Sequence, residues 1–212
     1  ELIIPDTVVS IGVNAFEKCC SLENITLSSS LDKILSGTFA NCSSLKTVTL
    51  PERLTRIEDR AFENCSSLRK VILNRQLTSI GKSAFYNCSS LTSIQLPDSL
   101  ISLGTQAFKG CTSLSEVKLS PNITNFAADV FTDTAITLVS DNGLLILDGY
   151  LLNGTEVCGN IVIPDSVHCI AAEAFKNNEQ LTEVCIPATV TSIGPNAFHG
   201  CSRLKKVQLL TS

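Results

Sequence analysis

The sequence contains no Met, no Trp and only two Tyr, so aromatic residues make up just 5% of its 212 positions. Charged residues are also few, at 17%, and the formal net charge of -4 lacks the basic excess that nucleic-acid-binding proteins usually carry. The longest apolar runs, such as Leu144 to Leu147, are far shorter than the roughly 20 residues that cross a bilayer. These absences argue against nucleic acid as a partner and predict no membrane span within this segment.

Apolar residues are abundant, at 44%, and the aromatic residues are nine Phe against two Tyr. A core must therefore be built from Leu, Ile and Val, together with one recurring large side chain. No signal peptide is visible, because residue 1 already lies inside a patterned segment. We expect the chain to be a fragment or the mature core of a longer protein.

Phe recurs at a constant interval along most of the chain. Its positions in this 23-residue series are Phe16, Phe39, Phe62, Phe85, Phe108 and Phe131, followed by Phe175 and Phe198. A Cys usually follows three residues later and a Leu three residues after the Cys, which leads to the rule A-F-x-x-C-x-x-L-x-x-[VI]-x-[LI]-(P)-x-x-[LV]-x-x-[IL]. Apolar positions in register over six or more units predict a repeat protein.

The segment x-[VI]-x-[LI], as at Lys70 to Leu73, alternates apolar with polar residues and is typical of a half-buried strand. Stacked units would pair these strands into a parallel sheet that rises roughly 4.8 Å per unit. We therefore predict a right-handed solenoid of about nine 23-residue rungs with this sheet on its concave face. The Ala-Phe pair is predicted to lie on a helical or 3-10 turn of the return side, and segments such as Ser79-Ile80 and Ser192-Ile193 to form a second, minor sheet.

In most units the residue before the repeated Cys (called the ladder Cys below) is either Asn or Gly. It is Asn41, Asn64, Asn87, Gly110, Asn177 or Gly200, with Lys18 as the exception in the first unit. Asn and Gly both tolerate a positive φ, so we expect a left-handed backbone conformation at this position. The Asn-x-Ser/Thr sequons at Asn41, Asn64 and Asn87 are then by-products of the turn rather than glycosylation sites.

The rule breaks after Phe131, where Thr134 replaces the Cys, and it resumes before Phe175. The interval between these two Phe is 44 residues, so 44 − 23 = 21 residues are extra. Apolar segments flank Asp148-Gly149, a strong signal for a two-residue hairpin turn. We interpret residues 137–160 as a β-hairpin inserted into a single domain spanning residues 1–212. A domain boundary in the same region is the alternative.

The repeated string A-F-x-N-C-S-S-L-x-x-V-x-L-P, at 61–73 and 84–97, resembles the BspA-like leucine-rich repeat proteins. This resemblance covers essentially the whole chain outside the insertion and implies a leucine-rich repeat solenoid. It also implies an extracellular or cell-surface location, because similar proteins are mostly surface or secreted proteins of host-associated bacteria and some protozoa. Several of these are linked to adhesion to host matrix proteins or cells. The motif is structural, so it transfers the fold and hardly the partner.

Ten Cys invite a disulfide or metal hypothesis, but six of them follow the repeat. These six are Cys19, Cys42, Cys65, Cys88, Cys111 and Cys201. Their spacing indicates packing as small buried thiols, with an occasional bridge between adjacent rungs left open. No C-x-x-C is present, so we predict no metal site. Among the remaining Cys, Cys185 occupies an outward strand position and is the best candidate for an accessible thiol.

The two His residues, His168 and His199, are expected at variable surface positions. Nothing in the repeat brings a nucleophile, a base and an orienting group together. We therefore predict no enzyme activity and no cofactor.

Outward strand positions are the candidate partner-binding surface. They comprise Thr26, Thr49, Lys70, Ile72, Gln95, Glu116, Lys118 and Glu183, with Thr47, Ser93, Cys185, Lys206 and Gln208 completing the face. The face is polar, of mixed charge and without aromatic anchors, which usually dominate binding energy. Tyr150 of the insertion is a further candidate, because inserted loops commonly carry function.

These observations favour an interaction or adhesion module that binds a protein partner, with host matrix or cell-surface proteins as candidates. The alternative is a structural spacer or stalk with no ligand of its own. A carbohydrate-binding or hydrolytic domain would need clustered aromatics or paired carboxylates on one face, and the sequence shows neither.

Overall fold

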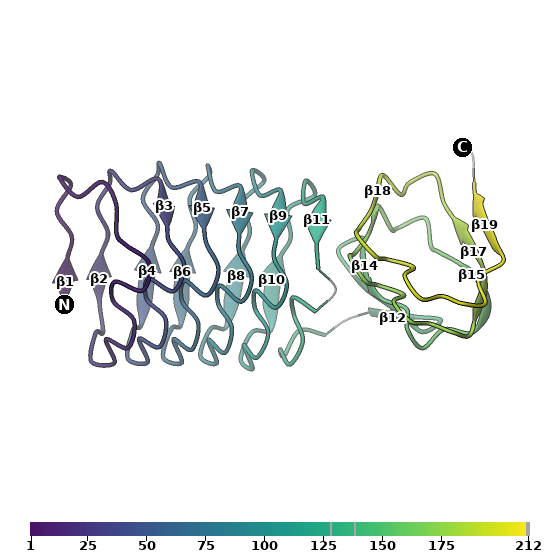
Figure 1. Ribbon diagram of the computed structural model, residues 1–212, viewed down its shortest axis with the longest axis horizontal. Helices are drawn as coiled ribbons and strands as arrows, with labels where there is room; N and C mark the ends of the chain where they lie inside the picture. The colour runs from purple at the N-terminus through teal and green to yellow at the C-terminus, as the bar shows by residue number, and fades with distance from the viewer. Residues whose placement is uncertain (128, 138, 211–212) are drawn as a thin grey trace. The chain divides into compact units, whose positions relative to one another are not determined.

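The structure is a computed structural model that describes residues 1–127, 129–137 and 139–210, with residues 139–141 described for their backbone alone (Figure 1). It separates into two compact units. Unit 1 comprises Glu1–Ile123 and Asp129–Ile136, and unit 2 comprises Thr124–Ala128 and Thr137–Ser212. Both are built from turns of a β-solenoid, about nine in the chain as a whole. That residues 1–212 form a single domain stays a prediction.

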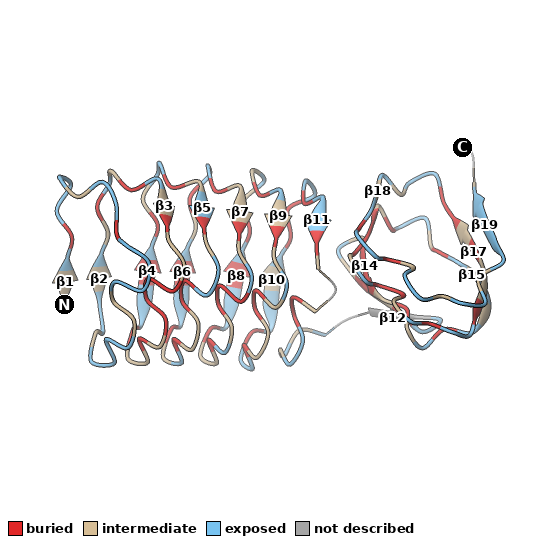
Figure 2. Cartoon of the chain, viewed as in Figure 1, coloured by how far each residue is buried: buried red, intermediate tan, exposed pale blue. Residues whose placement is uncertain are grey.

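The main strands of unit 1 follow the x-[VI]-x-[LI] segments. They are β1 (Leu2–Ile3), β2 (Ile25–Thr26), β4 (Thr47–Thr49), β6 (Lys70–Ile72), β8 (Ser93–Gln95) and β10 (Glu116–Lys118). β1 pairs with β2, β4 with β6 and β8 with β10, always in parallel and in the register of the repeat, as in Val48↔Val71. In β4, β6 and β8 the central residue is buried and its two neighbours are exposed (Figure 2). The predicted parallel pairing is confirmed, as three two-stranded sheets rather than one continuous sheet.

The predicted second sheet is also present in unit 1. Its strands are β3 (Lys33–Ile34), β5 (Arg56–Ile57), β7 (Ser79–Ile80) and β9 (Ser102–Leu103). They pair in parallel, and their apolar residues, such as Ile57 and Ile80, face the core. The core of unit 1 therefore lies between two sets of parallel strands, and we call each set a wall.

The Phe residues stack in one column between these walls. Consecutive rings from Phe16 to Phe131 lie 5.2 to 5.7 Å apart, measured between centroids, with interplanar angles of 14° or less. The rings of Phe39, Phe62, Phe85 and Phe108 are fully buried. Because each ring covers the next, no rung of unit 1 closes its core alone, and the predicted stacking is confirmed for this unit.

The return side consists of turns, and the expectation of helical or 3-10 turns is wrong for the described residues. Alternate backbone amides there bond to the neighbouring rung: the Phe39 N–H donates to the Ala61 carbonyl at 2.8 Å, and the Phe62 N–H to the Ala84 carbonyl at 2.8 Å. The amides between them bond within their own rung, as from Ala40 to the Gly37 carbonyl at 3.0 Å. A helix would need these donors for its own carbonyls. Stacking therefore replaces helix formation.

Positive φ occurs where the Asn and Gly pattern predicts it. The values are 62° at Asn41, 58° at Asn64, 56° at Asn87 and 76° at Gly110, and Lys18 also adopts 61°. The Asn side chains form a ladder, because Asn64 Nδ2 donates to Asn41 Oδ1 at 3.0 Å and Asn87 Nδ2 donates to Asn64 Oδ1 at 3.1 Å. This use of the amide nitrogens fits a structural role for the Asn residues.

Unit 2 contains two sheets. In one, β12 (Val139–Asp141), β13 (Leu144–Leu147), β14 (Tyr150–Asn153), β16 (Cys169–Ile170) and β18 (Ser192–Ile193) lie side by side. The other has the parallel order β15 (Gly159–Val162), β17 (Leu181–Ile186) and β19 (Lys206–Leu209). The short strand β11 (Asn125–Phe126) also belongs to this unit.

The predicted hairpin joins β13 to β14 through Asp148 and Gly149, which both have positive φ, at 46° and 81°. A second tight turn, at Asn142 and Gly143, joins β12 to β13. β14 then pairs in parallel with β16, which in turn pairs with β18. The second strand of the hairpin is thus itself a rung of the solenoid wall rather than an excursion from it.

Candidate interaction surface

The outward side chains of β4, β6, β8 and β10 form two rows on unit 1. The first row is Thr47, Lys70, Ser93 and Glu116, and the second is Thr49, Ile72, Gln95 and Lys118. All eight are exposed, above buried residues such as Val48 and Ile94. Thr26 is exposed in the same way at the end of β2. Nine of the sequence-predicted residues therefore share the outward side of the strands of one unit.

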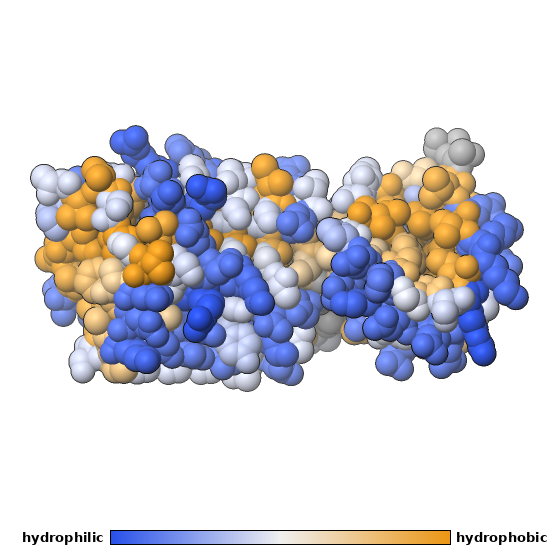
Figure 3. All heavy atoms as spheres, viewed as in Figure 1, coloured by the Kyte–Doolittle hydropathy of each residue, from blue (hydrophilic) through white to orange (hydrophobic). Residues whose placement is uncertain are grey.

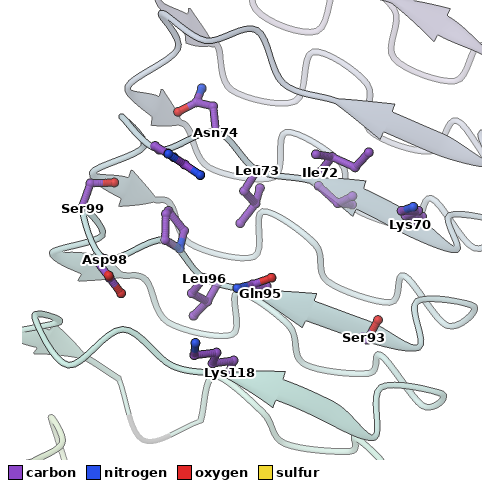
Figure 4. Close-up of a pocket in the computed structure, with 13 residues that line it drawn as sticks. Lys70, Ile72, Leu73, Asn74, Ser93, Gln95, Leu96, Asp98, Ser99 and Lys118 are labelled. Carbon is purple, nitrogen blue, oxygen red and sulfur yellow. The ribbon is translucent and has the colours of Figure 1, made fainter.

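A groove of about 730 Å³ lies on this face over β6, β8 and β10 (Figure 4). Val71 and Leu96 are buried apolar residues that line it. One wall is the segment after each strand, at Asn74 in one rung and at Pro97 to Ser99 in the next. Asn74 is itself buried and holds this wall, because its Nδ2 donates to the Leu54 carbonyl at 2.8 Å and its Oδ1 accepts from the Gln76 N–H at 2.8 Å.

Three cationic side chains, Lys70, Arg75 and Lys118, line the groove with a single carboxylate, Asp98. None of the three cations forms an ion pair with another described residue. Lys46, by contrast, binds Glu23 of the neighbouring rung at 2.6 Å. The groove therefore carries a local positive charge in a chain whose net charge is -4.

Glu183 belongs to unit 2, on β17, where Asn160 of β15 and Lys206 of β19 are its register neighbours. It is half-buried, as is Cys185 on the same strand. This strand is the unit 2 counterpart of the surface in unit 1. The groove of about 730 Å³ with its three cations is lined by residues of unit 1.

Tyr150 must be removed from the candidate set, because its side chain is completely buried. Its ring stacks on Phe126 at 4.8 Å and meets the edge of His168 at 4.5 Å, both measured between centroids. His168 is likewise not a free surface residue: its Nε2 is buried and has no hydrogen-bond partner among the described residues. Burial lowers the pKa of His168.

The ladder cysteines have a hydrogen-bonding role that the sequence did not reveal. From Cys42 onward, each ladder thiol donates to the carbonyl of a Phe in the preceding rung, as from Cys65 to Phe39 at 3.2 Å and from Cys88 to Phe62 at 3.2 Å. Burial raises the pKa of Cys42 to about 11 and that of Cys65 further. The reactive thiolate is therefore suppressed along the buried ladder.

The accessible thiols are Cys19, Cys20 and Cys158, which are exposed, while Cys185 is only half-exposed. The prediction that Cys185 is the best candidate for an accessible thiol is therefore wrong. Cys19 differs from the buried ladder members because it lies at the exposed first rung of unit 1. All ten Cys are free thiols.

Apolar side chains are exposed at the first rung of unit 1 and the last rung of unit 2 (Figure 3). Examples are Ile3 at 65% and Leu209 at 69% exposure. A solenoid rung buries its faces only against neighbouring rungs, so exposure at the outermost described rungs follows from the architecture. These faces therefore do not indicate a ligand by themselves.

No described segment forms a helix with the length and apolarity needed to cross a bilayer. Nor does the described part of the chain gather three or more His, Cys, Asp or Glu side chains in a way that could hold a metal ion.

Stacked rungs of one repeating length with an exposed parallel strand face define a repeat protein of the leucine-rich class. The sequence pattern of the BspA type leucine rich repeat region matches six copies, over residues 1–92, 33–145 and 145–212. The chain belongs to this family. No curated protein matches it.

Solved structures of bacterial leucine-rich repeat proteins are similar to this chain. One from Bacteroides ovatus is 25% identical with a TM-score of 0.51, and the match covers 99% of this chain and 69% of that one. The Treponema pallidum protein, named T. pallidum Leucine Rich Repeat protein, is 24% identical with a TM-score of 0.51, covering 96% and 72%. A leucine rich cell surface protein of Faecalibacterium prausnitzii is 28% identical with a TM-score of 0.49. Its match covers 97% of this chain but only 59% of the longer protein.

Proposed function

We propose that the chain is a non-enzymatic protein-interaction module of a cell-surface or secreted protein, and that it binds a protein partner through the strand face of unit 1. The observation that carries this proposal is the double row of exposed side chains over a buried core, hollowed by a groove of about 730 Å³. Such a face is ordered before the partner arrives, so binding loses little conformational entropy. Family membership supports the same class of role.

The proposed location rests on the resemblance of the repeats to surface and secreted proteins. Adhesion to host matrix or cell-surface proteins is the specific form of binding that this resemblance favours. The absence of a catalytic centre from the family motif supports the non-enzymatic part of the proposal.

A spacer without a ligand is the second candidate. One observation favours it: the two outward rows of unit 1 contain no aromatic side chain, whereas aromatic residues dominate most binding hot spots. Under this alternative the strand face is simply solvated, and changes on it affect no binding.

The test is capture of purified matrix and serum proteins on the immobilised chain. Thr49→Trp and Ser93→Trp would each fill part of the outward face of unit 1, and Thr112→Trp, at an exposed position on the return side, is the matched control. We expect the first two variants to lose the captured partner and the control to keep it. Capture unaffected by either face variant would overturn the proposed surface. No capture across the panel would favour the spacer.

A further inference from the structure

The groove on unit 1 combines a positive charge with a fixed spacing between its two lysines. Lys70 lies in the first outward row on β6, and Lys118 lies in the second row on β10. β8 pairs with β10, and β6 is the neighbouring strand from the adjacent two-stranded sheet. Two strand spacings therefore separate the two lysines across the strands, about 9.6 Å, and two residues separate them along the strands, about 6.6 Å. The diagonal between their Cα positions is therefore about 12 Å.

An extended peptide places residues i and i+4 on the same side, about 13 Å apart. Two carboxylates with this spacing would reach Lys70 and Lys118 together. The outward residues near the middle of the diagonal are Ser93 and Gln95, which can hydrogen-bond to a peptide, and Ile72 beside them is an exposed apolar contact at 45% exposure. The surface thus offers charge at two points with polar and apolar contacts between.

The placement of the charges also favours an acidic peptide over other anionic ligands of the groove. Glu116 follows Ser93 in the first row, and Asp98 lies in the groove wall. A sulfated glycan, which carries negative charge along its whole length, would meet these carboxylates. The described lining also contains no aromatic ring on which a sugar could stack. A peptide with two separated acidic residues avoids both problems.

We propose that this groove binds an extended acidic peptide segment whose carboxylates lie four residues apart, presented by the protein partner. The inference rests on the proposed function, since it names the chemistry of the partner at the same face. Lys70 and Lys118 bind the two carboxylates, and Ser93 and Gln95 contact the polar residues between them. Exposed ion pairs are individually weak, so the rest of the partner interface must contribute to affinity.

The test uses fluorescence anisotropy with a labelled peptide that carries Glu at two positions four residues apart among Ser and Ala. Its control carries Gln at both positions. We expect the Glu peptide to bind about three- to tenfold more tightly than the Gln peptide at low salt, as two exposed ion pairs allow. The difference should shrink as ionic strength rises to about 0.5 M, because salt screens exposed charges.

The double variant Lys70→Gln with Lys118→Gln should abolish the preference for the Glu peptide. Lys33→Gln with Lys82→Gln makes the same change of charge away from the groove and should preserve it, provided that circular dichroism shows both variants folded. Equal binding of the two peptides by the native chain would overturn the inference. So would a heparin oligosaccharide that binds more tightly than the Glu peptide through the same lysines.

Protein capture separates this inference from the proposed function. If the partner is still captured after the Lys70 and Lys118 changes but lost with Ser93→Trp, the face binds protein without an acidic segment and only this inference fails. If no partner depends on Ser93 either, the proposed function itself fails.

Discussion

Unit 1 and unit 2 follow the same repeat rule, but they differ in the side chain at the Cys position of the repeat and in the hydrogen bonds that this side chain makes. In unit 1 a Cys stands three residues after each Phe from Phe16 to Phe108, and from Cys42 onward its thiol makes one hydrogen bond to the preceding rung. In unit 2 the equivalent residue after Phe175 is Asn178, which is buried and whose side chain makes four hydrogen bonds. The difference shows what the insertion requires here. It leaves several backbone groups near one side chain, and the single donor of a thiol could not pair them all.

Asn178 pairs those backbone groups. Its Nδ2 donates to the carbonyls of Gly154 at 2.9 Å and Val157 at 2.8 Å, at the end of the inserted segment. Its Oδ1 accepts from the N–H groups of Gln180 and Leu181, both at 2.9 Å. One amide thus fixes the insertion to the rung that follows it.

The largest expected effect tests the aromatic column of unit 1. Phe85→Ala should lower the free energy of unfolding by about 3–5 kcal/mol, because the fully buried ring lies between two others and its cavity cannot close. Phe198→Ala in unit 2 should cost less, because Phe198 is half-buried and, among the described residues, stacks on the ring of Phe175 alone. Urea unfolding followed by circular dichroism measures both. Equal costs would contradict the view that the column is held from both sides.

The second effect sharpens the comparison at the ladder position. Asn178→Ala should cost about 3 kcal/mol, since it leaves buried carbonyl and N–H groups unpaired. Cys88→Ala, which removes one thiol hydrogen bond in unit 1, should cost about 1 kcal/mol. Hydrogen exchange should also show that Asn178→Ala loosens β14 and leaves β6 unchanged. A similar cost for both variants would mean that the amide has no special role.

The smallest effect concerns pH. Burial lowers the pKa of His168 below the ordinary value of 6.5, so the unfolded chain takes up a proton more readily than the folded one. The stability contribution of neutral His168 is therefore present above pH 6.5 and is lost as pH falls through the lower, folded pKa. Hydrogen exchange between pH 7 and pH 5 should show unit 2 opening more readily at the acid end. His168→Phe should reduce this change, and an unaltered pH response in that variant would remove His168 as its cause.

The sequence predicted most of the fold because the same residue types recur at one interval. The contacts between one pair of neighbouring rungs therefore recur in the next pair. The constant interval specified the Phe column, the cysteine ladder and both sets of parallel strands. It could not predict the burial of Tyr150, because Tyr150 of β14 pairs with Cys169 of β16 at an offset shorter than the repeat. The prediction of helical turns on the return side is wrong because alternate amides there bond to the neighbouring rung, which local propensity does not report.

The candidate surface was predictable only in part. Alternation identified the outward residues of unit 1, such as Lys70 and Gln95, because every second side chain of a strand faces outward. The groove itself depends on the wall held by Asn74, whose bonds reach back to the preceding rung. Such a feature needs residues of two neighbouring rungs, so the sequence of a single repeat does not predict it.

The central claim is that equivalent side chains of successive rungs stack directly upon one another and so hold the exposed strand face in place. A crystal structure of the chain tests it most directly. The account predicts that the rings from Phe16 to Phe131 form one column with centroids between 5.2 and 5.7 Å apart. Finding these rings in separate cores, or Lys70 and Gln95 turned inward, would contradict it.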